Sequence, residues 1–218
     1  MDMRDTERDI GTQPGISRRT FMQRSTLVAG SLIVLSTLPG AADAAPAAAV
    51  DYAPQALTSA ELATLKAVID RLIPTDALGP GAVDSNVHAY IDRELTAYFK
   101  ELLPLYQQSL AGIDAAAQHA HGMAFAALTA AQQDALLQQA EAGKLGSGWA
   151  GFFPVVLEHT REGMFGDPMY GGNTNYAGWD LIHYPGIKLV WSAGEQAIGT
   201  TVKPTHTSDA TYGGHPFE

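Results

Sequence analysis

Apolar residues recur at helical spacing over much of the chain after residue 57. The first stripe consists of residues three or four positions apart, namely Leu62, Leu65, Ile69 and Leu72. Thr58 and Glu61 have the spacing of a capping box, in which each side chain accepts a hydrogen bond from the other residue's backbone N–H. Pro74 cannot continue a helix. The pattern therefore predicts a helix that begins just after Thr58 and ends before Pro74.

The same signals predict four more helices. The second covers about residues 83–103, and the third runs from Pro104, which suits a first helical turn, to about residue 121. The fourth begins at a second capping box, Thr129 with Gln132, and is followed by Gly143 as a helix-ending residue. The fifth covers about residues 149–162, where Pro154 should either kink the helix or mark its true start. Only residues 187–191 look extended. We therefore predict a mostly α protein, a compact helical bundle.

The first 44 residues have the organisation of an export signal. Three arginines, at positions 18, 19 and 24, precede an apolar run over residues 26–38, and Ala42-Asp43-Ala44 has the small residues of a cleavage site. The apolar run is shorter than the roughly 20 residues needed to cross a bilayer. Ser17, Arg18, Arg19 and Phe21 resemble the twin-arginine signal, which directs the export of folded proteins. A plain secretory signal that happens to contain two arginines is the alternative.

The remainder of the chain divides by composition. Residues 45–56 form a linker rich in alanine and proline, and residues 57–192 form the helical domain. Residues 193–218 are rich in glycine, threonine and histidine, and they lack periodicity. We expect this C-terminal tail to be mobile unless a partner orders it.

Composition and charge narrow the possible functions. The 218 residues are 46% apolar, which suits one folded domain, and their net charge of −10 argues against nucleic-acid binding. Cleavage after Ala44 would remove five acidic and five basic residues, so the mature chain would keep its net charge of −10 and would bind anionic lipid poorly. The absence of cysteine excludes disulfides, thiolate metal sites, iron–sulfur clusters and thioether-linked haem.

Glycine and aromatic residues are concentrated between residues 160 and 186. Six of the 22 glycines fall there, beside Phe165, Tyr170, Tyr176, Trp179 and Tyr184. Glycine permits positive φ angles and close backbone approach, and aromatic side chains supply large, rigid contact surfaces. We expect an irregular but well-defined loop. Either the loop packs back on the helices, or it is a recognition surface for another protein, and both interpretations can hold together.

This stretch also carries a family resemblance. Three motifs, Glu162-Gly163-x-Phe165-Gly166-Asp167-Pro168-x-Tyr170-Gly171-Gly172-Asn173, Gly178-Trp179-x-Leu181-Ile182 and Tyr184-Pro185-Gly186, resemble the small subunit (subunit 3) of gluconate 2-dehydrogenase. Further motifs fit the same family, namely Leu57-Thr58-x-x-Glu61, Ile69-x-Arg71-x-Ile73-Pro74-Thr75-Asp76, Gly79-Pro80-Gly81-Ala82 and Tyr90-Ile91-Asp92-Arg93. The resemblance covers the signal and about residues 57–187.

The resemblance implies a non-catalytic subunit without a cofactor of its own. In such complexes a large FAD-containing subunit of the glucose–methanol–choline type oxidises a sugar or sugar acid. A multihaem cytochrome c subunit then accepts the electrons at the inner membrane. The small subunit carries the twin-arginine signal, and it escorts the flavoprotein through the twin-arginine translocase into the periplasm. Membrane contact is expected only through the complex.

We expect the loop over residues 165–186 to bind the flavoprotein. The expected aromatic anchors are Phe165, Tyr170, Tyr176 and Trp179. Gly166, Gly171 and Gly172 would shape the loop beside Pro168, and Asp167 and Asn173 would supply its hydrogen bonds. From the residues themselves, Asp167 is expected to be a turn aspartate that accepts from nearby backbone N–H groups.

An independent helical enzyme or metal protein is the rival hypothesis. It would use Glu158, His159 and Glu162, which lie within two turns of one helix, together with the tail residues His206 and His215. Glu-x-x-His is the order found in helical metal sites, and here the order is reversed, so a surface or capping role for these side chains is favoured. His119 and His121 are two residues apart, so on a helix their side chains point in nearly opposite directions, which disfavours chelation of a metal ion. The sequence contains no Gly-x-Ser-x-Gly, Walker or His-Glu-x-x-His motif. Gly146, Gly148 and Gly151 match Gly-x-Gly-x-x-Gly only in spacing, since no strand is predicted before them.

Overall fold

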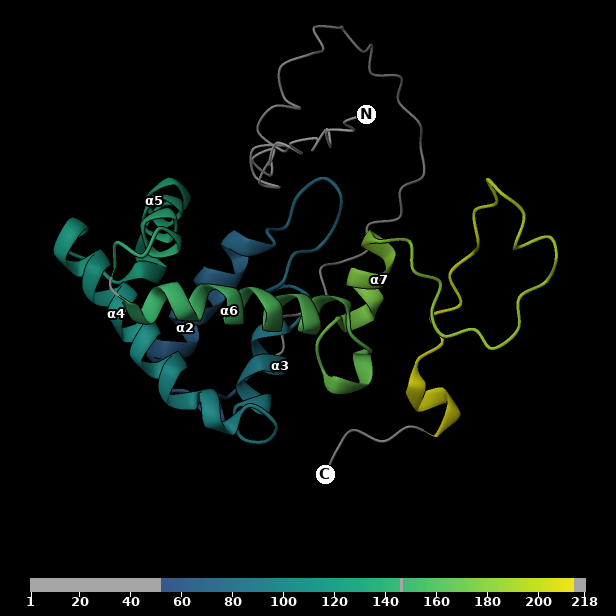
Figure 1. Ribbon diagram of the computed structural model, residues 1–218, viewed down its shortest axis with the longest axis horizontal. Helices are drawn as coiled ribbons and strands as arrows, with labels where there is room; N and C mark the ends of the chain where they lie inside the picture. Colours follow the sequence, from purple (N-terminus) through teal and green to yellow (C-terminus); the bar gives the residue numbers. More distant parts are fainter. Residues whose placement is uncertain (1–51, 146, 214–218) are drawn as a thin grey trace, which may run out of the picture. The chain divides into compact units, whose positions relative to one another are not determined.

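The computed structural model describes residues 52–145 and 147–213 (Figure 1). The predicted export signal and the linker up to residue 51 lie outside the described residues. Six α-helices occupy the described part of the chain: α2 (Ser59–Leu72), α3 (Val87–Glu94), α4 (Leu103–His121), α5 (Ala130–Glu141), α6 (Ser147–Phe165) and α7 (Ala177–Leu181). Short 3₁₀ turns lie between or after them: η2 (Lys100–Leu102), η3 (Phe125–Ala127), η4 (Pro168–Tyr170), η5 (Thr174–Tyr176) and η6 (Asp209–Tyr212). No β-strand occurs among the described residues, and the prediction of a mostly α fold is confirmed.

The capping signals locate three helix starts. The Thr58 hydroxyl accepts from the Glu61 N–H at 3.2 Å, and the Glu61 carboxylate accepts from the Thr58 N–H at 2.8 Å. Thr129 and Gln132 form the same reciprocal pair at the start of α5. α4 carries Pro104 in its first turn and ends at Gly122, whose φ of +73° is the left-handed conformation that glycine tolerates best. Each of these local signals was visible in the sequence.

Two predicted helices have different bounds in the structure. The helix expected over residues 83–103 is interrupted, because α3 covers only Val87–Glu94. Asn86 precedes it in the left-handed conformation, and beyond it the Thr96 hydroxyl donates to the Arg93 carbonyl at 2.7 Å, a local bond that competes with helix continuation. α6 is longer than expected and runs through Pro154, so this proline does not mark its start.

Helix α6 is central to the bundle. It contacts α2, α3, α4, α5 and α7, and Figure 1 shows it crossing the molecule between the other helices. The largest fully buried side chains come from several elements: Tyr106, Phe125, Phe152, Leu65, Ile69 and Ile91. The core therefore holds the C-terminal end of α6 in place, and this fixes where the following loop begins.

A buried aspartate fastens the segment that precedes α2. Asp92 on α3 is fully buried, and its carboxylate accepts from the Tyr52 hydroxyl at 2.8 Å. It also accepts from the backbone N–H groups of Gln55 at 2.6 Å, Ala56 at 3.2 Å and Leu57 at 2.8 Å. Four donors compensate the loss of water around this charge. Asp92 thus holds the segment 52–57 against α3, just before α2 begins.

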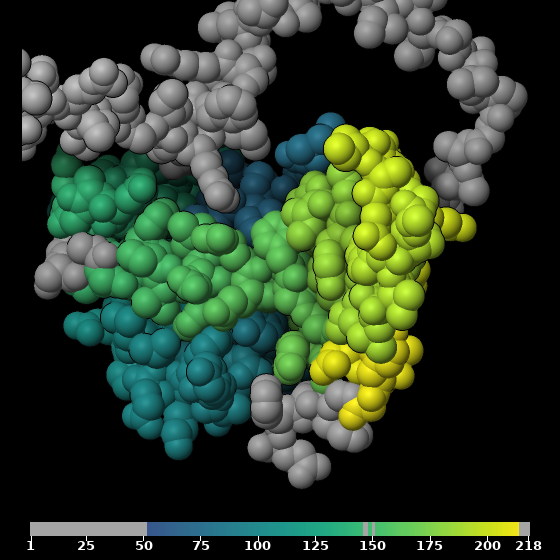
Figure 2. Space-filling model, turned by 45° about the vertical axis from the view of Figure 1, so that its right-hand side comes forward, coloured from purple at the N-terminus to yellow at the C-terminus, as the bar shows by residue number. Residues whose placement is uncertain are grey.

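The C-terminal segment turns back onto the chain that follows α6. The Ile187 N–H donates to the Thr207 carbonyl at 2.7 Å, and the Thr205 N–H donates to the Pro185 carbonyl at 2.8 Å. The extended segment expected at residues 187–191 is not a strand, since the described tail contains only an isolated bridge between Gly186 and Thr207. Figure 2 shows this segment against the end of the bundle.

Candidate partner-binding loop

The recognition loop, residues 165–186, begins where α6 ends. It contains η4, η5 and the short helix α7, which the sequence did not predict. Several residues in it have positive φ angles, among them Gly171 at +86°, Asn173 at +46° and Tyr176 at +61°. A backbone of this kind needs specific hydrogen bonds to hold it, and the loop contains them.

Asp167 closes the first turn of the loop. One of its carboxylate oxygens accepts from the Met169 N–H at 2.9 Å, and the other accepts from the Asp209 N–H in the tail at 2.7 Å. The expected turn role of Asp167 is therefore confirmed. The second bond, which fixes the tail to the loop, could not be read from the sequence.

Asn173 and Trp179 hold the loop together from within. The fully buried Asn173 amide donates to the Gly166 carbonyl and accepts from the Gly178 N–H, both at 2.8 Å. The Trp179 indole N–H donates to the Phe165 carbonyl at 2.9 Å, and the side chain is only 3% exposed. Both residues join the start of the loop to α7.

Glycines in the loop allow backbone segments to touch. A Cβ atom at Gly172 would overlap the Gly163 carbonyl of α6, and one at Gly178 would overlap the Met164 carbonyl. At Gly171 a Cβ would overlap the Arg93 guanidinium, which donates to the Tyr170 carbonyl. Close packing against backbone requires glycine at positions 172 and 178, and the positive φ angle favours it at 171. For Gly171 and Gly172 this agrees with the expectation that they shape the loop.

The structure divides the expected anchors into two groups. Phe165, Tyr170 and Tyr176 are half-buried and present part of their rings at the surface. Trp179 is inside the loop, against Tyr184 with ring centroids 4.9 Å apart, so it does not offer its ring to a partner in this conformation. Trp179→Ala would disturb the loop itself and is a poor probe of binding.

Two adjoining cavities lie where the loop meets α6. A cavity of about 280 Å³ is lined by Glu158, Arg161, Glu162 and Phe165. A second, of about 220 Å³, lies between Tyr90, Glu162 and Tyr170. Partial burial and the charge of Glu158 raise the pKa of Glu162, and burial together with the Glu162 charge raises the pKa of Tyr90. The Tyr90 hydroxyl donates to the Glu162 carboxylate at 3.4 Å.

His159, one of the three residues in the rival metal hypothesis, has neither a surface nor a capping role. It is buried on α6, stacked on Phe99 with ring centroids 3.8 Å apart, and it shares a 2.8 Å hydrogen bond with the Tyr106 hydroxyl. Burial lowers the pKa of His159 to about 4. The expectation of an exposed or capping side chain was wrong here, because this face of α6 points into the core rather than to solvent. In residues 52–145 and 147–213 no group of three or more histidine, aspartate or glutamate side chains is placed to hold a metal ion.

The tail histidines have separate positions. His206 stacks on Tyr176 with ring centroids 4.4 Å apart, and its Nε2 atom lies 2.7 Å from a carboxylate oxygen of Asp180. His215 lies outside the described residues. His119 and His121 are exposed at the end of α4, and His121 Nδ1 lies 3.3 Å from the side-chain nitrogen of Gln132.

Fold and loop together define a small helical domain whose most elaborate feature is an ordered loop rich in glycine and aromatic residues. A model of the family Gluconate 2-dehydrogenase subunit 3 matches residues 59–186, more than half of the chain and the whole bundle with its loop. The chain belongs to this family, as the sequence motifs predicted. No curated protein and no solved structure matches the chain.

Proposed function

We propose that this chain is the non-catalytic small subunit of a periplasmic, FAD-dependent dehydrogenase that acts on gluconate or another sugar. Its role is to bind the flavoprotein subunit, to escort it through twin-arginine export and to stabilise it afterwards. The family match over residues 59–186 carries the proposal. The Ser17-Arg18-Arg19-x-Phe21 motif supports the export role.

The chemistry of the chain agrees with a cofactor held elsewhere. FAD carries an anionic diphosphate, whereas the larger of the two cavities is lined by two carboxylates, Glu158 and Glu162, against one cation, Arg161, and measures only about 280 Å³. Pockets for molecules of drug size or larger generally have volumes of roughly 300 Å³ or more. Haem c is attached through cysteine, and the chain contains none. Following the family resemblance, we assign FAD to the large subunit and haem c to a multihaem cytochrome subunit.

The expected mechanism is binding by a preformed surface. The recognition loop is fixed by Asp167, Asn173 and its glycines, so a partner would meet Phe165, Tyr170 and Tyr176 in set positions. A preformed surface lowers the entropy cost of association. Among the described residues no helix is both long and apolar enough to cross a membrane. Following the family resemblance, we assign attachment of the complex to the inner membrane to the cytochrome subunit.

Co-expression with a gene for an FAD-containing dehydrogenase subunit from the same organism tests this proposal. The chain should purify in a stoichiometric complex with an FAD-containing protein, and the complex should oxidise a sugar or sugar acid while the isolated chain does not. Activity or stoichiometric metal in the isolated chain would favour the rival enzyme hypothesis.

A further inference from the structure

Exposed apolar side chains are concentrated just beyond the bundle. Of the ten large hydrophobic residues exposed in the described part of the chain, six lie between residues 182 and 198, namely Ile182, Tyr184, Leu189, Val190, Trp191 and Ile198. We call residues 188–200, which contain the last four and cross the predicted boundary between domain and tail at residue 192, the apolar tip. Leu189 is 73% exposed, Val190 79% and Ile198 fully exposed. An exposed cluster of this kind typically marks an interaction site.

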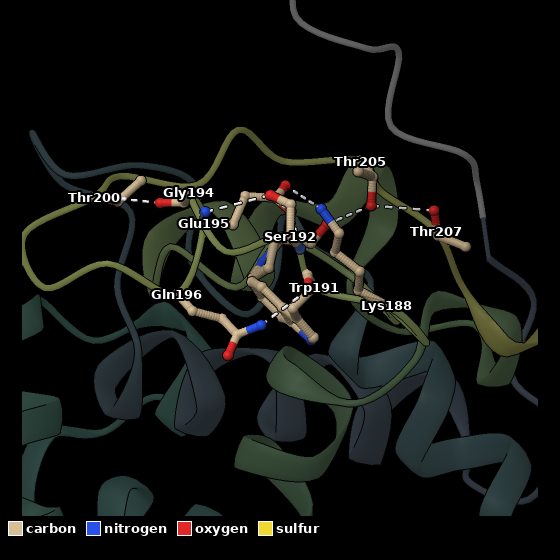
Figure 3. Close-up of polar contacts among 10 residues, drawn as sticks. Lys188, Trp191, Ser192, Gly194, Glu195, Gln196, Thr200, Thr205 and Thr207 are labelled. Carbon is tan, nitrogen blue, oxygen red and sulfur yellow. Dashed lines mark hydrogen bonds and ion pairs between the residues drawn. The ribbon is translucent and has the colours of Figure 1, made fainter.

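Internal polar contacts fix the apolar tip. Figure 3 shows Glu195 between Lys188, with which it forms an ion pair, and Ser192, whose hydroxyl donates to the same carboxylate at 2.8 Å. The Ser192 N–H donates to Glu195 at 2.9 Å, and the Thr200 hydroxyl closes the turn by donating to the Gly194 carbonyl at 3.1 Å. The hydrogen bonds with Lys188 and Ser192 lower the pKa of Glu195 to about 2. The polar side chains are thus satisfied within the segment. Leu189, Val190 and Ile198 are largely exposed, whereas the Trp191 ring is partly covered by Lys188, whose Nζ atom lies 5.2 Å from the ring centroid.

The apolar tip is attached to the recognition loop. At the base of the tip, the Ile187 N–H donates a hydrogen bond to the Thr207 carbonyl, and the Thr205 N–H donates to the Pro185 carbonyl. Further along, His206 stacks on Tyr176 and pairs with Asp180. A partner that covers the half-exposed Tyr176 would therefore lie beside the apolar tip.

Charge favours a protein partner over lipid or a second copy. Residues 52–180 contain six basic and fourteen acidic residues, a net charge of −8. Residues 181–208 contain Lys188 and Lys203 against Glu195 alone, a net charge of +1. The acidic body would be repelled by anionic lipid and by an equally acidic second copy. Contact through the near-neutral apolar tip with a subunit of a different kind does not oppose two identical acidic bodies, as self-association would.

We infer that the apolar tip is a docking element for the flavoprotein subunit, inserting Leu189 and Val190 into an apolar recess of that partner. The inference rests on the proposed function and goes beyond the family description, because the family match ends at residue 186, before the tip begins. The tip is an addition to the family domain, and it extends the recognition loop into a larger contact surface.

Binding measurements with a purified, FAD-containing dehydrogenase subunit from the same organism test the inference. The double variant Leu189→Ser/Val190→Ser should raise Kd at least about tenfold, since buried anchors dominate interface energetics. The single variant Ile198→Ser gives a second, independent probe. Leu78→Ser is the matched control, because Leu78 is 74% exposed in the turn between α2 and α3 and should leave Kd unchanged within about twofold.

The outcomes separate the inference from the proposed function. If the wild-type chain does not bind the flavoprotein, the proposed function fails. If it binds and both tip variants bind equally well, the proposed function stands and the inference is overturned. Vesicle sedimentation with phosphatidylcholine and phosphatidylglycerol, and light scattering of the chain alone, provide further arms. Loss of vesicle binding or of dimer formation in the double variant, with flavoprotein binding unchanged, would reassign the tip to lipid or to self-association.

Discussion

The Asp92 carboxylate gives the sharpest stability prediction. Asp92→Ala removes the acceptor for the Tyr52 hydroxyl and for the N–H groups of Gln55, Ala56 and Leu57. A buried donor left without a partner costs about 1–3 kcal/mol. The Leu57 bond is fully buried, whereas the other three are half-buried and can be partly replaced by water. We expect the free energy of unfolding to fall by about 3–5 kcal/mol.

Urea unfolding followed by far-ultraviolet circular dichroism measures this loss. Asp84→Ala is the control, because its carboxylate accepts a single exposed bond from the Thr75 hydroxyl and should cost less than about 1 kcal/mol. The loss in free energy of unfolding for Asp92→Asn should lie between the losses for Asp92→Ala and Asp84→Ala. The amide oxygen can still accept hydrogen bonds, whereas the NH₂ group would face other donors. Hydrogen exchange should also become faster at the Leu57 amide. A loss below about 1 kcal/mol for Asp92→Ala, or one equal to that of Asp84→Ala, would refute the role of Asp92 in holding residues 52–57.

Two further changes probe packing and pH. Gly172→Ala should destabilise the chain by about 1–3 kcal/mol through overlap with the Gly163 carbonyl. Gly148→Ala, on an open face of α6, should be neutral or stabilising in the same thermal melts, and equal effects of the two variants would argue against the close approach. Burial lowers the pKa of His159 to about 4, so between pH about 6.5 and 4 the unfolded chain takes up a proton at this position that the folded chain does not. The free energy of unfolding should therefore decrease by about 3 kcal/mol as the pH falls through this window, and remain at its full value above it. The paired variant Tyr106→Phe/His159→Leu should reduce this dependence without abolishing it, because burial also lowers the pKa of His88 to about 4. An unchanged pH profile would count against the buried neutral imidazole of His159.

Local signals in the sequence were sufficient for most helix starts. The capping boxes at Thr58 and Thr129 and the proline in the first turn of α4 each act within a few residues, so spacing alone reveals them. After α3 the chain continues in tight turns, in which the Thr96 N–H donates to the Arg93 carbonyl and the Ala97 N–H to the Glu94 carbonyl. Hydrophobic periodicity does not reveal such a change of hydrogen-bond pattern. α7 was missed because its five residues are held by Asn173 and Trp179 rather than by helical propensity.

The candidate site was predictable in composition and less so in geometry. Glycine and aromatic enrichment located the recognition loop, and Asp167 was recognised as a turn residue. The sequence could not show that Trp179 is buried and Tyr176 only half-buried. Burial in an irregular loop depends on residues distant in sequence, such as His206, which stacks on Tyr176. The burial of His159 likewise depends on Phe99 and Tyr106, which come from other elements.

The central claim is that this chain carries the flavoprotein across the membrane, and cell fractionation tests it most directly. The precursor with Arg18→Lys/Arg19→Lys should be co-expressed with the flavoprotein and compared with Arg4→Lys/Arg8→Lys, which changes two arginines outside the motif. We predict that periplasmic dehydrogenase activity and periplasmic flavoprotein both fall to background in the first variant and stay at wild-type levels in the second. Undiminished periplasmic activity with Arg18→Lys/Arg19→Lys would contradict the escort role.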